Sequence, residues 1–499
     1  MKKLVFTLLL LSSSLLSFGQ GYNHQWLLGS YNFIQDPKGR MLFDSSNYIL
    51  LNENRKMTFY GTQANICDSN GNLLMSSNGI WIANATGDTM MNGGGLNPGG
   101  ITSNWPNGLP LIANNIILPY PNDIDKYVLF HHTFTFTGST NLCFELYSTI
   151  IDITLDGGLG EVIQKNNLII QDTLSGGIGA CRHANGRDWW VVMFEDSSDF
   201  VYKIHYSVNN TITISTQDLN FFPVAKGNSS QPTFSPDGTK FITTTYDNSI
   251  SRNSYLILND FDRCTGIFSN PHSIYLTSGD YLYGVSFSPS GEFIFATTSN
   301  YIFQINANNL NVDTVAIYDG FISPVGFSCC QTTFWNMYLA ANGKIYVTSG
   351  SGVQHLHEIN YPDSAGLACD VQQHSIFLGY AQLRAVPNHP NYYLGCDTTS
   401  SCPCLTTGIE EPENHDFKFS VSPNPNNGNF KISYLLPQNE KGKLEIYDVN
   451  GRKVYEMNLP PWSTMQSISL PVSVGSGVYN CVIVSDGERV NRKIAVFKE

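Results

Sequence analysis

The chain has 499 residues, a formal net charge of −13 at pH 7, and only 13% Asp, Glu, Lys and Arg, about half the usual share. Neutralising nucleic-acid phosphates requires clustered Lys and Arg, so we exclude nucleic acid as a partner. Polarity comes instead from Asn, Ser, Thr and Gly, and 12% of the residues are aromatic, a mixture typical of many short strands joined by tight turns.

The first element is a predicted secretory signal peptide. Lys2 and Lys3 precede the apolar run 4–16 and the sequence "SFGQ", so we expect a signal peptide over residues 1–19 that is cleaved after Gly19. No transmembrane segment is expected after its removal. Eleven cysteines in an exported chain allow disulfides and leave at least one thiol free. Cys396, Cys402 and Cys404 cluster near a predicted domain boundary.

A turn motif then recurs at a constant interval. "FSPDG" ends at Gly238 and "FSPSG" at Gly291, while "RHANG" and "LAANG" end at Gly186 and Gly343. The steps between these glycines are 52, 53 and 52 residues. Earlier turns are expected at "CDSNG", which ends at Gly71, and within 119–127, and an apolar strand follows each turn. We expect residues 386–395 to begin a seventh unit.

Four strands in each unit of about 50 residues predict the blades of a β-propeller. We therefore expect an all-β chain with a seven-bladed β-propeller over residues 20–397. The stretch 26–35 is expected to complete the last blade and close the ring. A stack of β-sandwiches is the competing architecture, but it would not keep a constant period.

A different pattern begins after residue 400. The polar stretch 398–415 is expected to be a linker. Two hairpins with turns at Asn450-Gly451 and near Asp486-Gly487 follow. Residues 416–499 therefore predict a small immunoglobulin-like β-sandwich.

This C-terminal region resembles the type A C-terminal sorting domain of the type IX secretion system of Gram-negative bacteria. The resemblance rests on "SPNP" at 422–425, "IYDVNGRKV" at 446–454, "GSGVYNCVI" at 475–483 and "RKIAVFK" at 492–498. It implies export by the type IX secretion machinery, to the medium or to the outer-membrane surface. It also implies a set of recognition or fold residues: Pro423, Asn424, Pro425, Gly428, Gly477, Tyr479 and Lys493. The alternative is that these are only turn and core residues of a sandwich.

The repeats themselves resemble the lactonase-like or quinoprotein-like propellers of surface proteins from the same bacteria. The stretches "ICDSNGNLLMSSNGIWIANATG", "CRHANGRDWWVVM" and "YGVSFSPSGEFIFATTS" carry this likeness. It implies a fold and a location, and it implies no particular reaction.

Two groups of residues are candidates for ligand contact. Arg182, His183, Asp188 and Trp189 surround one of the repeated turns and could hold a sugar or a carboxylate. The alternative, which we favour, is that a tryptophan fills the core between blades and Asp188 caps the turn. Trp105 lies in a long Gly/Asn/Pro-rich loop, 90–108, which is expected to shape a ligand or partner surface.

Metal sites have weaker support. His355 and His357 share one strand face, so they are weak candidates for metal ligands if a third ligand comes from another blade. Asp-rich turns such as "NDFDRC" and "YPDSAG" could bind calcium, with turn capping as the favoured alternative. We therefore predict no cofactor, with calcium as the open possibility.

We predict that the propeller is a binding or interaction module for a carbohydrate or a surface protein. The alternative is a lactonase-like hydrolase or lyase that uses the central funnel, and a third option is a purely structural surface protein. Clustered acidic or His side chains at one mouth of the funnel would favour an enzyme. A lining of Ser, Thr and aromatic residues would favour a binding protein.

Overall fold

In a computed structural model of the chain, the described residues are 21–30, 37–43, 47–137, 140–221, 231–247, 250–324, 330–384, 386–405, 418–435, 442–449, 451–459, 465–485 and 488–498. The chain divides into two compact units, Met1–Thr406 and Thr407–Glu499. The predicted signal peptide and the predicted turns at Asn450 and Asp486-Gly487 lie outside the described residues. Within those residues, no helix is both long enough and apolar enough to span a bilayer.

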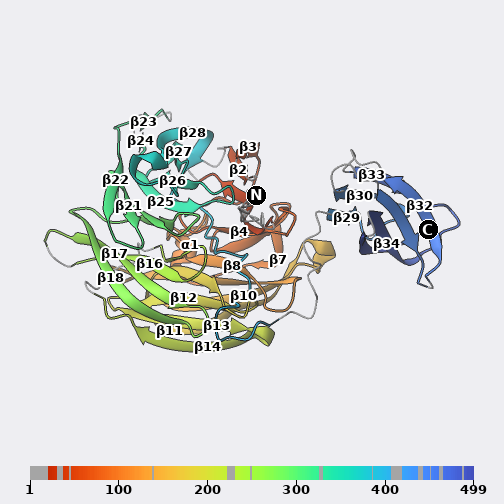
Figure 1. Ribbon diagram of the computed structural model, residues 1–499, viewed down its shortest axis with the longest axis horizontal. Helices are drawn as coiled ribbons and strands as arrows, with labels where there is room; N and C mark the ends of the chain where they lie inside the picture. Colours follow the sequence, from red (N-terminus) through yellow and green to blue (C-terminus); the bar gives the residue numbers. More distant parts are fainter. Residues whose placement is uncertain are drawn as a thin grey trace, which may run out of the picture. The chain divides into compact units, whose positions relative to one another are not determined.

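Mostly antiparallel strands dominate the first unit (Figure 1). In chain order they are β1 (Gln25–Leu28), β2 (Lys38–Phe43), β3 (Tyr48–Glu53), β4 (Ala64–Cys67), β5 (Leu73–Ser77), β6 (Trp81–Asn84), β7 (Thr89–Gly94), β8 (Asn115–Pro119), β9 (Lys126–Thr137), β10 (Thr140–Asp152), β11 (Glu161–Arg182), β12 (Trp189–Glu195), β13 (Phe200–Ser207) and β14 (Thr211–Asp218). They continue with β15 (Thr233–Phe234), β16 (Lys240–Tyr246), β17 (Asn253–Asp262), β18 (Ile267–Ser278), β19 (Gly284–Phe287), β20 (Phe293–Thr297), β21 (Tyr301–Asn306), β22 (Val312–Ile317), β23 (Ile322–Ser323), β24 (Cys330–Gln331), β25 (Phe334–Leu339), β26 (Ile345–Ser349), β27 (Val353–Ile359) and β28 (Val371–Gln382). The short helices are η1 (Gly21–Asn23), α1 (Gly100–Asn104), η2 (Asp156–Gly158), η3 (Val208–Asn210) and η4 (Gly366–Cys369).

The strands form consecutive sheets in which each strand pairs with the next one along the chain. β4–β7, β15–β18, β19–β22 and β25–β28 each follow this pattern, and β1–β3 form a three-stranded sheet at the N-terminus. The long strand β11 serves two sheets, because residues 161–174 pair with β10 and residues 174–182 pair with β12. It therefore completes the sheet of β8–β10 and begins the sheet of β12–β14.

The repeated turn after the first strand of a sheet has the predicted geometry. Five of these turns place glycine at a φ between +73° and +81°: Gly71, Gly186, Gly238, Gly291 and Gly343. In each turn the glycine amide donates to the carbonyl three residues earlier, as Gly238 does to Ser235 at 2.8 Å. Side chains disfavour this left-handed conformation, so glycine is the residue that suits it. The interval seen in the sequence is therefore the spacing between successive copies of this turn.

Neighbouring sheets are held together by shared hydrophobic cores. One core joins β4–β7 with β8–β11 and β12–β13, and three further cores continue the series from β12–β13 to β16–β18, β19–β21 and β25–β28. The series then returns to the N-terminal sheet, where the rings of Trp26 and Phe43 each lie 5.6 Å from the ring of Tyr346 in β26. The last sheet therefore packs against the first.

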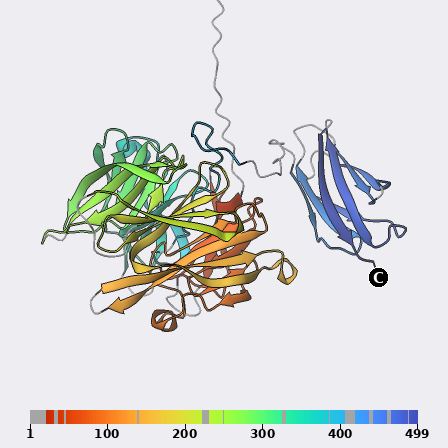
Figure 2. The same cartoon turned by 90° about the horizontal axis from the view of Figure 1, so that it is seen from below.

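The first strands of the sheets also lie next to one another in chain order, as β1, β4, β8, β11, β15, β19 and β25. Figure 2 shows the first unit from a second side, with its strands grouped in several sheets. This all-β arrangement resembles a β-propeller, with the first strands lining its axis.

The second unit contains β29 (Lys418–Ser422), β30 (Asn429–Leu435), β31 (Gly442–Tyr447), β32 (Lys453–Leu459), β33 (Met465–Ser469), β34 (Gly477–Ser485) and β35 (Glu488–Val496). They form two sheets, ordered β29-β30-β33 and β32-β31-β34-β35. Side chains from both sheets, among them Ile432, Leu444 and Ile494, form one hydrophobic core. The unit therefore has a core of its own.

Candidate ligand-binding cavity

Residues 386–395, which we name the channel segment, were expected to begin a seventh repeated unit. They contain neither a strand nor a hairpin, and the remaining sheet is formed by β1–β3 at the N-terminus. Pro387 and Pro390 lack the backbone N–H that a ladder requires. The segment instead bonds to the first strands of several sheets.

Side chains of the channel segment donate hydrogen bonds to backbone carbonyls of the first strands. The buried amide of Asn388 donates to the carbonyl oxygens of Asn115 in β8, at 3.2 Å, and Ile178 in β11, at 2.9 Å. His389 Nε2 donates to a carbonyl of β4 at 2.6 Å, and Tyr392 Oη donates to a carbonyl of β8 at 2.9 Å. These bonds join the segment to β4, β8 and β11.

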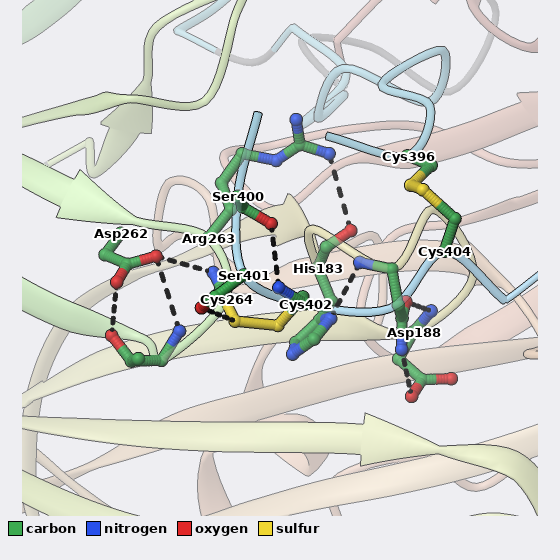
Figure 3. The surroundings of a disulfide bond; sticks show 12 residues. His183, Asp188, Asp262, Arg263, Cys264, Cys396, Ser400, Ser401, Cys402 and Cys404 are labelled. Carbon is green, nitrogen blue, oxygen red and sulfur yellow. Dashed lines mark hydrogen bonds between the residues drawn. A yellow bond between two sulfur atoms is a disulfide. The ribbon is translucent and has the colours of Figure 1, made fainter. Parts of the chain in front are cut away.

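Two disulfides fix the chain directly after the channel segment (Figure 3). Cys396 bonds to Cys404, and Cys264, in the turn between β17 and β18, bonds to Cys402. Arg263 adds a hydrogen bond from Nη2 to the carbonyl of Gly395 at 2.7 Å. Residues 398–405, which we expected to belong to the linker, are therefore attached to the first unit.

A cavity of about 480 Å³ lies between the channel segment and the first strands of three later sheets. Its lining comes from η1, from β15, β19 and β25 with the turns that follow them, and from the channel segment. The lining residues are Asn23, His24, Gln231, Thr233, Phe234, Pro236, Val285, Ser286, Phe287, Pro289, Tyr338, Leu339, Ala340, Ala341, Asn342, Gly343, His389, Pro390, Asn391 and Tyr393.

The lining of this cavity is mainly apolar, and most of its polar side chains are amides and hydroxyls. Among the described residues that line it, none is Asp, Glu, Lys or Arg. Burial lowers the pKa of His389 to about 4, so its ring is neutral at pH 7. Tyr338 is only 8% exposed, and its hydroxyl is enclosed in the core between β25–β28 and β1–β3 without a hydrogen-bond partner in the described part of the chain.

The residues predicted around the Gly186 turn lie together but are largely enclosed. The Arg182 guanidinium lies 4.0 Å from the centroid of the Trp189 ring, and Arg182 donates to the carbonyl of Tyr392 at 3.2 Å. Trp189 is fully buried, and His183 is 7% exposed. None of them lines the cavity, so their ligand-binding role stays a prediction.

Asp188 is held by its own turn. It is 2% exposed and accepts hydrogen bonds from Asn185 Nδ2 at 2.9 Å and Arg187 Nε at 2.7 Å. Burial alone would raise the pKa of Asp188, but the hydrogen bonds from His205, Arg187 and Asn185 outweigh it and hold the pKa well below its usual range. Asp188 therefore remains a carboxylate that orders the turn.

The loop 90–108 contributes to the hydrophobic core as well as to the surface. Leu96 and Ile101 are buried in the core shared by β4–β11. Trp105 is half-buried, and its ring lies edge-on to Tyr60 at 4.7 Å. Trp105 does not line the cavity, so its role in binding stays a prediction.

His355 and His357 lie on β27, and both bond within the protein. His355 Nδ1 is 3.1 Å from Ser323 Oγ, while His357 Nδ1 accepts from the backbone amide of His374 at 2.9 Å. Burial lowers the pKa of His357 to about 3. In the described ranges, no three His, Cys, Asp or Glu side chains gather as metal ligands would. In the "NDFDRC" turn, Asp262 accepts from the amide of Cys264 at 2.8 Å.

The predicted sorting residues come together at one end of the second unit. The Asn424 side chain donates to the carbonyl of Lys493 at 2.9 Å and accepts from the amide of Ala495 at 2.8 Å, so "SPNP" is joined to "RKIAVFK". Tyr479 donates to the carbonyl of Gly475 at 2.8 Å. Gly428 has a φ of +95°, and an added Cβ would lie 2.5 Å from the Lys498 side chain. Pro423, Pro425, Gly477 and Lys493 are exposed, and Tyr479 is buried.

Sequence reasoning missed the cavity residues. Pro236, Pro289 and Asn342 belong to the repeated turns, so the period located them along the chain without showing that they meet at one cavity. Asn391 and Tyr393 lie in the stretch that was expected to begin a seventh unit. One signal in the sequence could have corrected this prediction: the apolar strand pattern that follows the other turns is missing after "VPNHPN".

Comparison with known proteins identifies the second unit. Residues 420–497 match the family described as "Secretion system C-terminal sorting domain". The C-terminal unit is therefore a type IX sorting domain, which marks the chain for export and confirms the resemblance found in its motifs. No curated protein matches the chain significantly.

The chain is also similar to several solved structures, all at low sequence identity. A proposed 6-phosphogluconolactonase from Bacteroides uniformis is 13% identical, with a TM-score of 0.38, and the match covers 74% of this chain and 99% of that one. A nidogen/laminin complex is 11% identical, with a TM-score of 0.33 and coverage of 70% and 91%. A proposed TolB from Agrobacterium tumefaciens is 9% identical, with a TM-score of 0.27 and coverage of 67% and 85%. At this level of similarity they carry no statement about activity.

Proposed function

We propose that the chain is an exported binding protein, built as a seven-bladed β-propeller followed by an immunoglobulin-like β-sandwich that serves as the sorting domain. The order of the sheets, and the packing of β1–β3 against β25–β28, support seven blades. The two sheets around one core support the sandwich. The sorting domain directs the chain to the type IX machinery, and we place the product in the medium or on the outer surface of a Gram-negative bacterium.

The observation that carries the binding role is the uncharged cavity on the axis. It is bordered on one side by the channel segment, whose C-terminal end is fixed by two disulfides. A preformed cavity of this size suits a small ligand. A hydrolase or lyase would need a positioned acid, base or metal ligand. The described lining offers no carboxylate, and of its two histidines His389 already bonds to the Asn65 carbonyl. The lining thus supports binding over catalysis.

A cavity-filling variant tests this role. The full-length protein and its Ala341→Trp variant would be screened by saturation-transfer NMR against mixed neutral and charged sugars, short peptides and small metabolites. Ala341 is half-buried and lines the cavity, so the indole should occupy ligand space. Thr216→Trp, on the exposed edge strand β14, is the matched control. Signals that are lost only in Ala341→Trp support the proposal, and equal signals in all three proteins contradict it.

A further inference from the structure

The amide side chains in the cavity suit hydroxyl groups. Asn23, Asn342 and Asn391 are half-buried and line the cavity, and each is oriented by a bond within the chain. Asn391, for example, donates to the carbonyl of Pro236 at 2.6 Å, and Asn23 Oδ1 accepts from Tyr393 Oη at 3.0 Å. An amide has two N–H donors and a carbonyl with two lone pairs. It can therefore bond to a hydroxyl, which both donates and accepts.

The remaining lining is apolar and partly aromatic. Phe234 and Tyr393 are half-buried, while Phe287 and Tyr338 are more deeply placed. Pro236 and Pro289 add further apolar surface. A sugar ring carries C–H faces between its hydroxyls, so it can contact this surface while its hydroxyls reach the amides. A purely apolar ligand would leave the amides unpaired.

The lining disfavours a charged ligand. Apart from the imidazoles of His24 and His389, no group among the described lining residues could pair as a cation with a phosphate or carboxylate, and no carboxylate can pair with an amine. Burying an ionic group without a partner is strongly unfavourable. Phosphorylated and acidic sugars should therefore bind much more weakly than neutral ones.

We propose that the cavity binds a neutral saccharide, a mono- or disaccharide unit, with the cavity asparagines bonding to its hydroxyls and the aromatic side chains contacting its C–H faces. This assignment rests on the proposed binding role of the cavity, and it specifies the chemical class of the ligand.

The test uses the full-length protein and defined probes. Isothermal titration and saturation-transfer NMR would compare maltose, cellobiose and N,N′-diacetylchitobiose with glucose 6-phosphate, glucuronic acid and glycylglycine. We expect at least one neutral sugar to bind and the charged sugars not to bind. Asn23→Asp keeps the oxygen that accepts from Tyr393 but loses the amide N–H donors. It should weaken that binding about 3- to 10-fold, as expected for one lost hydrogen bond. Asn308→Asp, at an exposed turn outside the cavity, should leave the binding unchanged. Asn23→Asp keeps the shape of the side chain, so the fold should be kept even if Ala341→Trp does not fold.

The outcomes separate the two proposals. If only a charged sugar or the peptide binds, and its binding is lost in Ala341→Trp, the saccharide assignment is wrong while the binding role stands. If no probe binds to a folded protein, the saccharide assignment is wrong, and the wider screen decides the binding role. Neutral-sugar binding that resists both Asn23→Asp and Ala341→Trp would place the sugar elsewhere and overturn the assignment.

Discussion

The side-chain amide of Asn388 lies 2.9 Å from the carbonyl oxygen of Ile178, 210 residues earlier in the chain. The same amide also donates to Asn115. One side chain thus joins the channel segment to β8 and β11, the first strands of two neighbouring sheets. This contact holds the channel segment against the axis.

Asn388→Asp should therefore be strongly destabilising. A carboxylate has nearly the same shape but only accepts hydrogen bonds, so it would face two carbonyl oxygens. We expect the free energy of unfolding to fall by about 2–4 kcal/mol, as for a buried polar group left unpaired. Chemical denaturation of the purified protein measures this. Asn308→Asp, at an exposed turn, should change it by less than about 0.5 kcal/mol. Equal effects of the two substitutions would show that Asn388 is not buried as described.

The two disulfides should contribute unequally to stability. Cys264–Cys402 closes a loop of 138 residues, and Cys396–Cys404 closes one of 8. If a disulfide acts mainly on the entropy of the unfolded chain, the longer loop should stabilise the protein by about 2–3 kcal/mol more. The double variants Cys264→Ser/Cys402→Ser and Cys396→Ser/Cys404→Ser should therefore differ by this amount in urea titrations. Equal losses would indicate that local packing, rather than loop length, determines both contributions.

His389 should make the first unit sensitive to acid. Burial lowers its pKa to about 4 in the folded protein, compared with about 6.5 in an unfolded chain. The unfolded state therefore takes up a proton first, so the stability is complete above about pH 6.5 and is lost as the pH falls toward 4.

His389→Gln isolates this effect. Gln can still donate to the Asn65 carbonyl but does not titrate. The variant should lose up to about 3 kcal/mol less stability than the wild type between pH 7 and pH 4. Urea titrations across this pH range provide the comparison. Identical pH profiles for the two proteins would argue against a neutral, buried His389.

The variant Lys493→Ala tests whether the secretion machinery recognises this residue or whether it serves only the fold of the sorting domain. Its side chain is exposed on β35, so Lys493→Ala should leave the thermal unfolding of the second unit unchanged. If Lys493 is recognised, the fraction of protein outside the cell should fall severalfold and the periplasmic fraction should rise. Lys431→Ala, at an exposed lysine of β30 outside the motifs, is the control.

Asn424→Leu gives the contrasting case. It removes two hydrogen bonds to β35, which should lower the free energy of unfolding of the second unit by about 1–3 kcal/mol. Export should fall together with stability in this variant. Normal amounts of Lys493→Ala outside the cell would instead indicate that Lys493 is not read by the secretion machinery.

The repeated units were predictable because a local backbone requirement is visible in the sequence. A tight turn with positive φ favours glycine, so Gly186, Gly238, Gly291 and Gly343 revealed the period directly. The channel segment was not predictable in the same way. Its Pro, Asn and Gly residues are typical of a turn, but Asn388 and Tyr392 bond to carbonyls more than 200 residues away. Such pairings depend on the assembled axis, and the cavity depends on them in turn.

The packing of Trp26 against Tyr346 has a consequence for how the protein is made. These residues are 320 positions apart in the chain, so the ribosome releases the first sheet long before the sheet that covers it. Until then, the indole of Trp26 and the apolar side of β1–β3 have no permanent cover, and such surfaces promote aggregation. A product that stops short of β26 would keep this side bare and would be readily degraded by proteases. The protein therefore resists aggregation and proteolysis only when the chain has been synthesised through β26.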